Sequence, residues 1–205
     1  MIKIYLARHG QDEDNASGIL NGHRDKPLTK VGVEQALSLA QNIKNHNLKI
    51  GKVFSSPLLR VYKTAEAITN ALELDKPKKL EMLIERDFGI MTGEMIKNIQ
   101  SMCSPDIIST NKITYFLSPQ GAETFPQLMD RANKLFKWIE QQNFSENILL
   151  ATHGDIGKMI YATYYNLPWK NVLTDFHFGN TELLLLDKDA KPENRLIVKT
   201  KQHNH

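Results

Sequence analysis

The chain has 205 residues, of which 41% are hydrophobic and 24% charged, and its formal net charge is +3. This is the composition of an ordinary globular protein with one buried core, and the small charge argues against a nucleic-acid-binding tail. Cys103 is the only cysteine, which excludes an internal disulfide and fits a reducing compartment. Because no apolar stretch has the length of a signal sequence or a membrane span, we expect a soluble cytoplasmic protein with neither nucleic acid nor membrane as a partner.

The first predicted element is a buried strand over residues 2–7, which ends at Arg8-His9-Gly10. Gly10 lets the chain turn sharply or approach a ligand closely. Residues 11–28 are polar and predict a surface loop that is too long for a mere connection. Thr29 is a good N-cap for the helix that follows. The apolar stripe of that helix is expected to consist of Val33, Ala36, Leu37, Ala40 and Ile43.

A second strand is expected at 52–55, and Ser56-Pro57 predicts the cap and first residue of the next helix. Another strand is predicted near 80–84, directly before Glu85. The irregular residues 90–122 are interpreted as a lid or insert, with a short helix near 94–102.

A clean amphipathic pattern predicts a helix from Phe125 to Ile139, and an apolar run at 148–152 predicts a strand that ends at His153-Gly154. A helix through Met159 and two strands, at 181–186 and 196–198, complete the chain. The alternation of strand-like and helix-like periods favours an α/β architecture.

Reactive side chains follow three of the predicted strands, and one more lies at the start of a helix. They are Arg8 with His9, Glu85 and His153 at strand ends, and Arg60 in the first turn of the helix after Pro57. Ligands in open α/β sheets collect at the carboxyl ends of the strands, and a helix N-terminus favours an anion. An arginine fork suits a phosphoryl group, and a neutral imidazole can attack one.

Taken singly, each of these residues also has an ordinary structural explanation. His9 suits a hydrogen-bonded turn, and His153 suits a packed core histidine. Arg60 suits a solvated helix position, and Glu85 suits a weak loop ion pair with Arg86. Two apolar strands that both end in His-Gly nevertheless indicate two imidazoles in one crevice.

Several motifs in one order connect these residues to a known family. They are Arg8-His9-Gly10, residues 21–29 followed by Gly32 and Gln35-Ala36, residues 55–60 with Thr64-Ala65, residues 83–89, residues 121–124, and Thr152-His153-Gly154. With these motifs the chain resembles the histidine phosphatase superfamily, in its phosphoglycerate-mutase-like branch. The resemblance implies a three-layer αβα sandwich with a mostly parallel central sheet. It also implies a single domain over residues 1–205, with the insert at about 90–122.

The resemblance implies a role for each site residue. His9 would attack phosphorus and become a phosphohistidine, and Glu85 would donate a proton to the leaving oxygen. The remaining positions would bind the phosphoryl group: Arg8, Asn15, Asn21, Gly22, Arg60, His153 and Gly154. Asp155 is the second choice for the acid. No metal or cofactor is expected, because arginines and histidines supply the positive charge.

Other phosphoryl chemistries fit the sequence poorly. The residue six after Cys103 is Ser109, where a cysteine phosphatase needs arginine. Asp12-Glu13-Asp14 is separated from the strand and lacks the hydroxyl residue of an aspartate phosphatase, so these acids are expected to be loop charges. The scattered histidines do not have the spacing of a metal site.

The expected activity is therefore hydrolysis of a small-molecule phosphomonoester. A mutase would need extra cations, whereas residues 87–130 contain no arginine and only Lys97 and Lys112. A phosphoglycerate mutase activity and a catalytically weak regulator that binds a phospho-ligand remain as alternatives. The sequence leaves a homodimer open.

Overall fold

The computed structural model describes residues 2–190 and 195–199 and is built on a six-stranded sheet with the order β3-β2-β6-β1-β7-β8. The strands are β1 (Ile4–Arg8), β2 (Ile50–Ser55), β3 (Lys78–Lys79), β6 (Asn147–Thr152), β7 (Leu183–Leu186) and β8 (Leu196–Val198). The first four strands of that order, β3, β2, β6 and β1, pair in parallel. β7 pairs antiparallel with β1, and β8 pairs antiparallel with β7.

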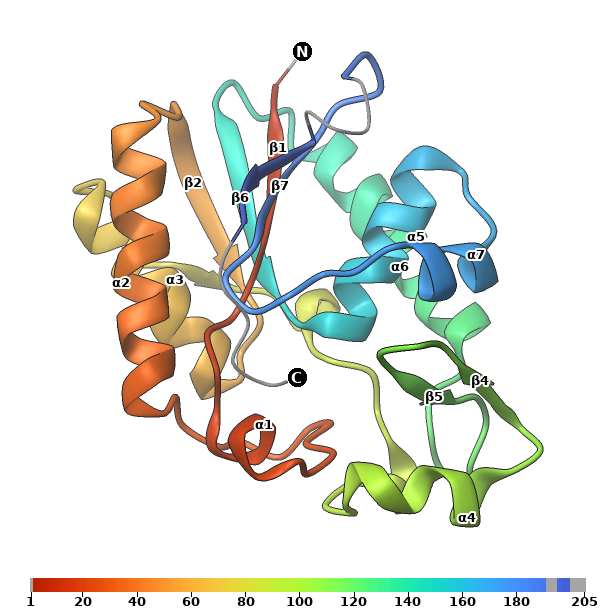
Figure 1. Ribbon diagram of the computed structural model, residues 1–205. Helices are drawn as coiled ribbons and strands as arrows, with labels where there is room; N and C mark the ends of the chain where they lie inside the picture. Colours follow the sequence, from red (N-terminus) through yellow and green to blue (C-terminus); the bar gives the residue numbers. More distant parts are fainter. Residues whose placement is uncertain (1, 191–194, 200–205) are drawn as a thin grey trace.

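Helices cover both faces of this sheet (Figure 1). α2 (Lys30–Asn45) and α3 (Leu59–Ala71) lie on one face, and α5 (Phe125–Gln141), α6 (Gly154–Tyr165) and α7 (Trp169–Asp175) lie on the other. Alternation along β1 produces this arrangement, since Tyr5 packs with the core of α2 and α3 while Leu6 packs with the core of α5 and α6. The predicted α/β class and three-layer sandwich with a mostly parallel sheet are confirmed.

The predicted helix starts are correct at two positions. The Thr29 hydroxyl accepts a hydrogen bond from the Gly32 amide at the start of α2, and Thr124 forms a capping box with Gln127 at the start of α5. The predicted apolar stripe of α2 is wrong at two positions, because Val33 is 46% exposed and Leu37 is 58% exposed. The helix is rotated so that its buried face includes Leu39 and Gln35 instead.

Three predicted boundaries are also wrong. Residues 80–84 form no strand, since a 3₁₀ turn, η1 (Glu81–Leu83), follows the two residues of β3. α3 begins at Leu59, two residues later than Ser56-Pro57 predicts, and its N-cap is Leu58, whose amide donates to the Ser56 hydroxyl. The predicted loop over 11–28 contains a short helix, α1 (Glu13–Ser17).

The insert, residues 90–122, lies with α1 beyond the carboxyl ends of β1 and β6 (Figure 1). Its elements are η2 (Gly89–Met91), η3 (Ile96–Asn98), α4 (Ile99–Cys103) and an antiparallel hairpin of β4 (Ile107–Ser109) and β5 (Thr114–Phe116). Phe88, Met91 and Phe116 belong to a separate small apolar cluster that stabilises this segment. No helix among the described residues is sufficiently long and apolar to span a membrane.

Candidate active site

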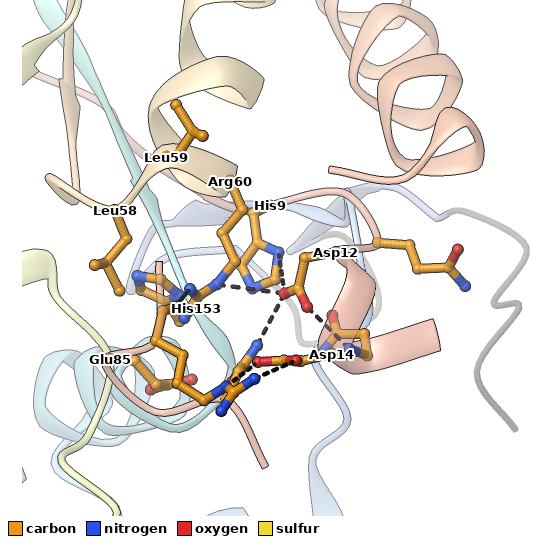
Figure 2. Close-up of polar contacts among 12 residues, drawn as sticks. His9, Asp12, Asp14, Leu58, Leu59, Arg60, Glu85 and His153 are labelled. Carbon is orange, nitrogen blue, oxygen red and sulfur yellow. Dashed lines mark hydrogen bonds and ion pairs between the residues drawn. The ribbon is translucent and has the colours of Figure 1, made fainter. Parts of the chain in front are cut away.

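The register of two central strands places the two strand-end histidines side by side. β1 and β6 are parallel, and Arg8 pairs with Thr152 at their carboxyl ends. The next residues are His9 and His153, whose ring centroids are 5.1 Å apart with planes at 66°. This distance is close to the spacing of neighbouring strands, so the sheet itself sets the separation of the rings. The prediction that both imidazoles share one crevice is confirmed (Figure 2).

The protonation state of His9 follows from its surroundings. Its Nδ1 lies 2.6 Å from the Gly10 carbonyl oxygen, which can only accept a hydrogen bond. Nδ1 therefore carries the proton, and Nε2 keeps the lone pair. The ring is 2% exposed, and burial together with the charges of Arg60 and Arg8 lowers its pKa well below the usual value. His9 is therefore a neutral imidazole with a nucleophilic Nε2 at neutral pH.

His153 is completely buried, and its Nε2 lies 2.8 Å from the Ser56 hydroxyl oxygen. Burial and the charge of Arg60 lower the pKa of this imidazole well below its usual value. Ser56 follows β2, the strand on the other side of β6, so three neighbouring strands build this part of the site.

Both predicted arginines lie at the histidine pair, and backbone carbonyls hold them. The buried Arg60 donates from Nη1 to the Arg24 carbonyl (2.7 Å) and from Nη2 to the Gly22 carbonyl (2.9 Å). Arg8 donates from Nη1 to the Phe178 carbonyl (2.7 Å). These bonds fix the direction of each guanidinium before any ligand binds.

In the part of the chain that the structure describes, three buried side-chain nitrogens have no hydrogen-bond partner: Arg8 Nε, Arg60 Nε and His153 Nδ1. All three belong to this cluster. Burial of hydrogen-bonding groups without partners is costly. An oxyanion that accepted hydrogen bonds from these three nitrogens would remove this cost, so the cluster fits such a ligand.

The carboxylate of Glu85 lies below the histidines in Figure 2 and is 5% exposed. Oε1 accepts hydrogen bonds from the amides of Arg86 (2.9 Å) and Ile156 (3.1 Å), and Oε2 from those of Gly154 (3.0 Å) and Asp155 (3.3 Å). Burial and the charge of Asp155 raise the pKa of Glu85. The amide bonds and Arg60 act in the opposite direction.

A family comparison agrees with this geometry. A model of the histidine phosphatase superfamily (branch 1) matches residues 4–197. The chain belongs to this superfamily. The match includes every motif that carries the resemblance in the sequence.

Relatives of this chain include both phosphatases and mutases. Phosphoserine phosphatase 1 of Hydrogenobacter thermophilus is 27% identical over 75% of this chain and 71% of that protein. A 2,3-bisphosphoglycerate-dependent phosphoglycerate mutase of Bartonella quintana is 28% identical over 95% of this chain and 97% of its own. The crystal structure of Entamoeba histolytica phosphoserine phosphatase with 3-phosphoglyceric acid has a TM-score of 0.72, at 26% identity and 90% coverage of both chains.

Of the other predicted phosphate ligands, one lines a cavity and three contact residues of the site. Asn15 lines a cavity together with Arg8. Asn21 donates its side-chain amide to Asp12, Gly22 supplies a carbonyl to Arg60, and the Gly154 amide bonds Glu85. The last three therefore hold charged site residues in place.

Gly10 approaches a helix rather than a ligand. A Cβ on Gly10 would lie 2.3 Å from the Gly32 carbonyl oxygen at the start of α2. A Cβ on Gly32 would in turn lie 1.9 Å from the Gln11 carbonyl oxygen. The two glycines therefore allow the segment after His9 to pack against the first turn of α2.

Sequence reasoning missed three polar residues at the site. Asp12, expected to be a loop charge, is completely buried beside His9 and Arg60. Ser56 contacts His153, as described above. Lys158 is buried on α6 and donates to the hydroxyl of Tyr115 in β5, and burial lowers its pKa to about 8. No local spacing pointed to Lys158, because a residue five positions after His153 does not share its helix face.

A cavity of about 520 Å³ opens beside Arg8 and Asn15. We call it the insert cavity, because residues 96–100 and 110–114 form much of its wall. Lys97 and Lys112, the two cations counted in the sequence, both line it. Arg8, which belongs to the histidine cluster, lies on the wall of this cavity.

Proposed function

We propose that this protein is a metal-independent phosphomonoester hydrolase that acts through a phosphohistidine on His9. The observation that carries the proposal is the neutral His9, with its free Nε2, beside His153 and two oriented guanidinium groups. A nucleophile of this kind needs no deprotonation, and the donors are placed before charge develops on the phosphoryl oxygens.

In the first step, His9 Nε2 forms a bond to phosphorus while the bond to the leaving oxygen breaks. Glu85, in its protonated form, gives its proton to that oxygen, so an alcohol leaves. In the second step, Glu85 takes a proton from water, and the oxygen of that water forms a bond to phosphorus while the bond between phosphorus and His9 Nε2 breaks. His9 returns to its neutral form and inorganic phosphate is released. Arg8, Arg60 and His153 stabilise the oxygens in both steps.

The raised pKa of Glu85 supports its role as the acid, because an ordinary carboxyl group would be ionised at neutral pH. Asp155 is already engaged by the guanidinium of Arg86, in an ion pair of 2.8 Å. The geometry therefore supports Glu85 over Asp155.

We propose a small phosphorylated carboxylic acid as the substrate. The insert would act as the lid, with the leaving group in the insert cavity, where Lys97 and Lys112 suit a carboxylate. Similarity to phosphoserine phosphatases supports this substrate class. The same two lysines and the similarity to a phosphoglycerate mutase over nearly the whole chain favour a mutase as the second candidate.

The test begins with para-nitrophenyl phosphate and with phosphoserine and 3-phosphoglycerate, each with and without a chelator. Release of inorganic phosphate that the chelator leaves unchanged is expected. Transfer of phosphate between the hydroxyls of phosphoglycerate at a rate above that of hydrolysis would favour the mutase. Ligand binding without turnover would favour the phospho-ligand-binding regulator.

His9→Ala should reduce turnover by about a thousandfold or more and abolish phosphoenzyme trapping with radiolabelled substrate. His46→Ala is the matched control, because His46 is an exposed histidine at the end of α2. A fully active His9→Ala protein would disprove the phosphohistidine route.

A further inference from the structure

Asp12 is a fully buried carboxylate in the middle of the cationic cluster. Its Oδ2 lies 3.4 Å from Arg60 Nε and 3.8 Å from His9 Nδ1 (Figure 2). The same oxygen accepts a hydrogen bond of 2.8 Å from Asn21, and Oδ1 accepts one of 2.9 Å from the Asn15 amide. Asp12 therefore contacts His9 and Arg60, which the proposed reaction uses, and also Asn15 and Asn21, which the sequence predicts as phosphate ligands.

This position is electrostatically unusual, because an anion already occupies one side of an anion site. Arg60 Nε has no hydrogen-bond partner, and the nearest carboxylate oxygen to it is that of Asp12. A bound oxyanion and Asp12 would thus compete for the same N–H group. The negative charges of the oxyanion and of an ionised Asp12 would repel each other strongly in this buried site.

The charges around Asp12 come from several elements. Arg8 and Arg60 favour its ionised form, and Asp14 on α1 opposes it. Asp14 itself is held by Arg24 at 2.8 Å. Burial is the largest influence and raises the pKa of Asp12.

The remaining titratable groups in the cluster are His9, His153 and Glu85. The two histidines are neutral for the reasons given above, and the charge of Glu85, like that of Asp12, acts on Arg60. A negative ligand would favour protonation of each of these groups to some degree. An experiment on Asp12 therefore has to separate its proton from theirs.

We propose that Asp12 is a ligand-binding residue of the phosphoryl site and that its carboxyl group takes up a proton when a tetrahedral oxyanion binds. The neutral carboxyl then donates a hydrogen bond toward the ligand, and Arg60 Nε is released to the oxyanion. Oδ1 continues to accept the hydrogen bond from the Asn15 amide, so the N-cap of α1 is retained. By linkage, a lower pH strengthens oxyanion binding through this residue. The inference rests on the proposed function only for the location of the oxyanion.

Sulfate is a suitable probe, because it is tetrahedral, cannot be hydrolysed as an ester and stays a dianion over the whole range in which proteins are folded. Its binding is measured by isothermal titration at a series of pH values between about pH 5 and about pH 8, above the ordinary pKa of a carboxyl group. Each titration is repeated in two buffers with different ionisation enthalpies, which counts the protons taken up per sulfate bound.

Wild-type protein is expected to take up protons and to bind sulfate on the order of tenfold more weakly at the alkaline end than at the acid end. Asp12→Asn and Asp12→Thr both keep an acceptor for the Asn15 amide. Both should bind sulfate about tenfold more tightly than the wild type near the alkaline end and take up fewer protons. Asp130→Asn removes an exposed carboxylate on α5, away from Asp12, and it should keep the wild-type proton uptake.

Proton uptake that is the same in the wild type and in both Asp12 variants would overturn the inference and leave Asp12 as a helix cap. Wild-type binding with no proton uptake at any pH would overturn it without any variant, which covers the case in which a variant does not fold. Sulfate binding that is independent of Asp12 leaves the proposed function intact. No sulfate binding in any of the proteins would count against the oxyanion site itself and against both proposals.

Discussion

Arg86 and Asp155 form an ion pair of 2.8 Å that joins the Glu85 segment to the first turn of α6. The Arg86 guanidinium lies 4.2 Å from the ring centroid of Phe116 and 4.4 Å from that of Phe125. Arg86 is 1% exposed, so this ion pair is buried on one side and connects the insert, α5 and α6. Glu85 is thus held in rigid surroundings, and the nearby charge of Asp155 disfavours its ionised form.

Asp155→Asn should move the alkaline limb of the pH profile toward lower pH. Asp155 is the nearby charge that raises the pKa of Glu85, and its removal also leaves Arg86 unpaired, which favours the ionised acid further. Since the proposed first step needs protonated Glu85, kcat/KM for an alkyl phosphate should then fall at a lower pH. Pre-steady-state and steady-state rates over a pH series measure the pH at which this limb falls.

The exposed Asp130 on α5 supplies the control Asp130→Asn, in which the alkaline limb should stay at the wild-type pH.

Glu85→Gln should reduce kcat by about a hundredfold or more for an alkyl phosphate. If Glu85→Gln matches the wild type, or if the Asp155→Asn limb moves upward, Glu85 is not the acid.

Ser56→Ala should lower kcat by about tenfold with little change in KM. The Ser56 hydroxyl lies 2.8 Å from His153 Nε2 and orients that ring toward His9, so its loss leaves the imidazole free to rotate. Ser55→Ala is a close control, because it removes a buried hydroxyl one residue away that bonds only the Ser56 carbonyl. Equal losses in the two variants, or no recovery of activity in Ser56→Thr, which keeps the hydroxyl, would indicate a packing defect and not a positioning role.

The convergence of the histidines was predictable because it depends on one topological fact. Two apolar strands that both end in His-Gly meet at one sheet edge when they are parallel neighbours, and the pairing of Arg8 with Thr152 aligns them without a shift. Arg60 followed from its place at a helix start. These predictions needed only strand direction and local spacing.

The burial of Asp12 and the contact of Ser56 were not predictable in the same way. A polar run such as residues 11–28 indicates a surface loop. The close packing of Gly10 on Gly32, which holds the start of this loop against α2, is not visible in the local pattern. Ser56 reaches His153 because β2 is the neighbour of β6, and strand order is not visible in local patterns. The hairpin of β4 and β5 was missed since its strands are three residues each and lie in a Ser/Pro/Asn-rich segment.

Lys112→Ala and Lys97→Ala should discriminate between substrates. Both lysines line the insert cavity beside Arg8, and neither belongs to the histidine cluster. KM for phosphoserine should rise about threefold to tenfold in each variant, while KM for para-nitrophenyl phosphate, whose leaving group has no carboxylate, should change little.

Lys134→Ala removes an exposed cation on α5 and serves as the control. If both substrates lose affinity equally in the insert variants, the lysines act only through the general field of the site. If neither substrate is affected, the carboxylic-acid substrate class is wrong.

His153→Gln should reduce the loss of stability that acid causes. His153 is buried and neutral in the folded protein, with a lowered pKa, whereas in the unfolded chain its pKa is about 6.5. The unfolded state therefore binds more protons, and stability falls as the pH drops below about 6.5. At about pH 5.5 the contribution of one such histidine is about 1.4 kcal/mol.

Urea unfolding at about pH 7.5 and about pH 5.5 measures the effect as the difference in free energy of unfolding between the two pH values. Asp12 and Glu85, whose pKa values are raised, act with the opposite sign, since protonation favours their folded form as the pH falls, but both residues are present in wild type and variant alike. The difference should therefore shrink in His153→Gln by up to about 1.4 kcal/mol and keep its wild-type size in His46→Gln. An unchanged difference in His153→Gln would mean that His153 is already protonated in the folded protein, which would remove the neutral imidazole pair on which the proposed reaction depends.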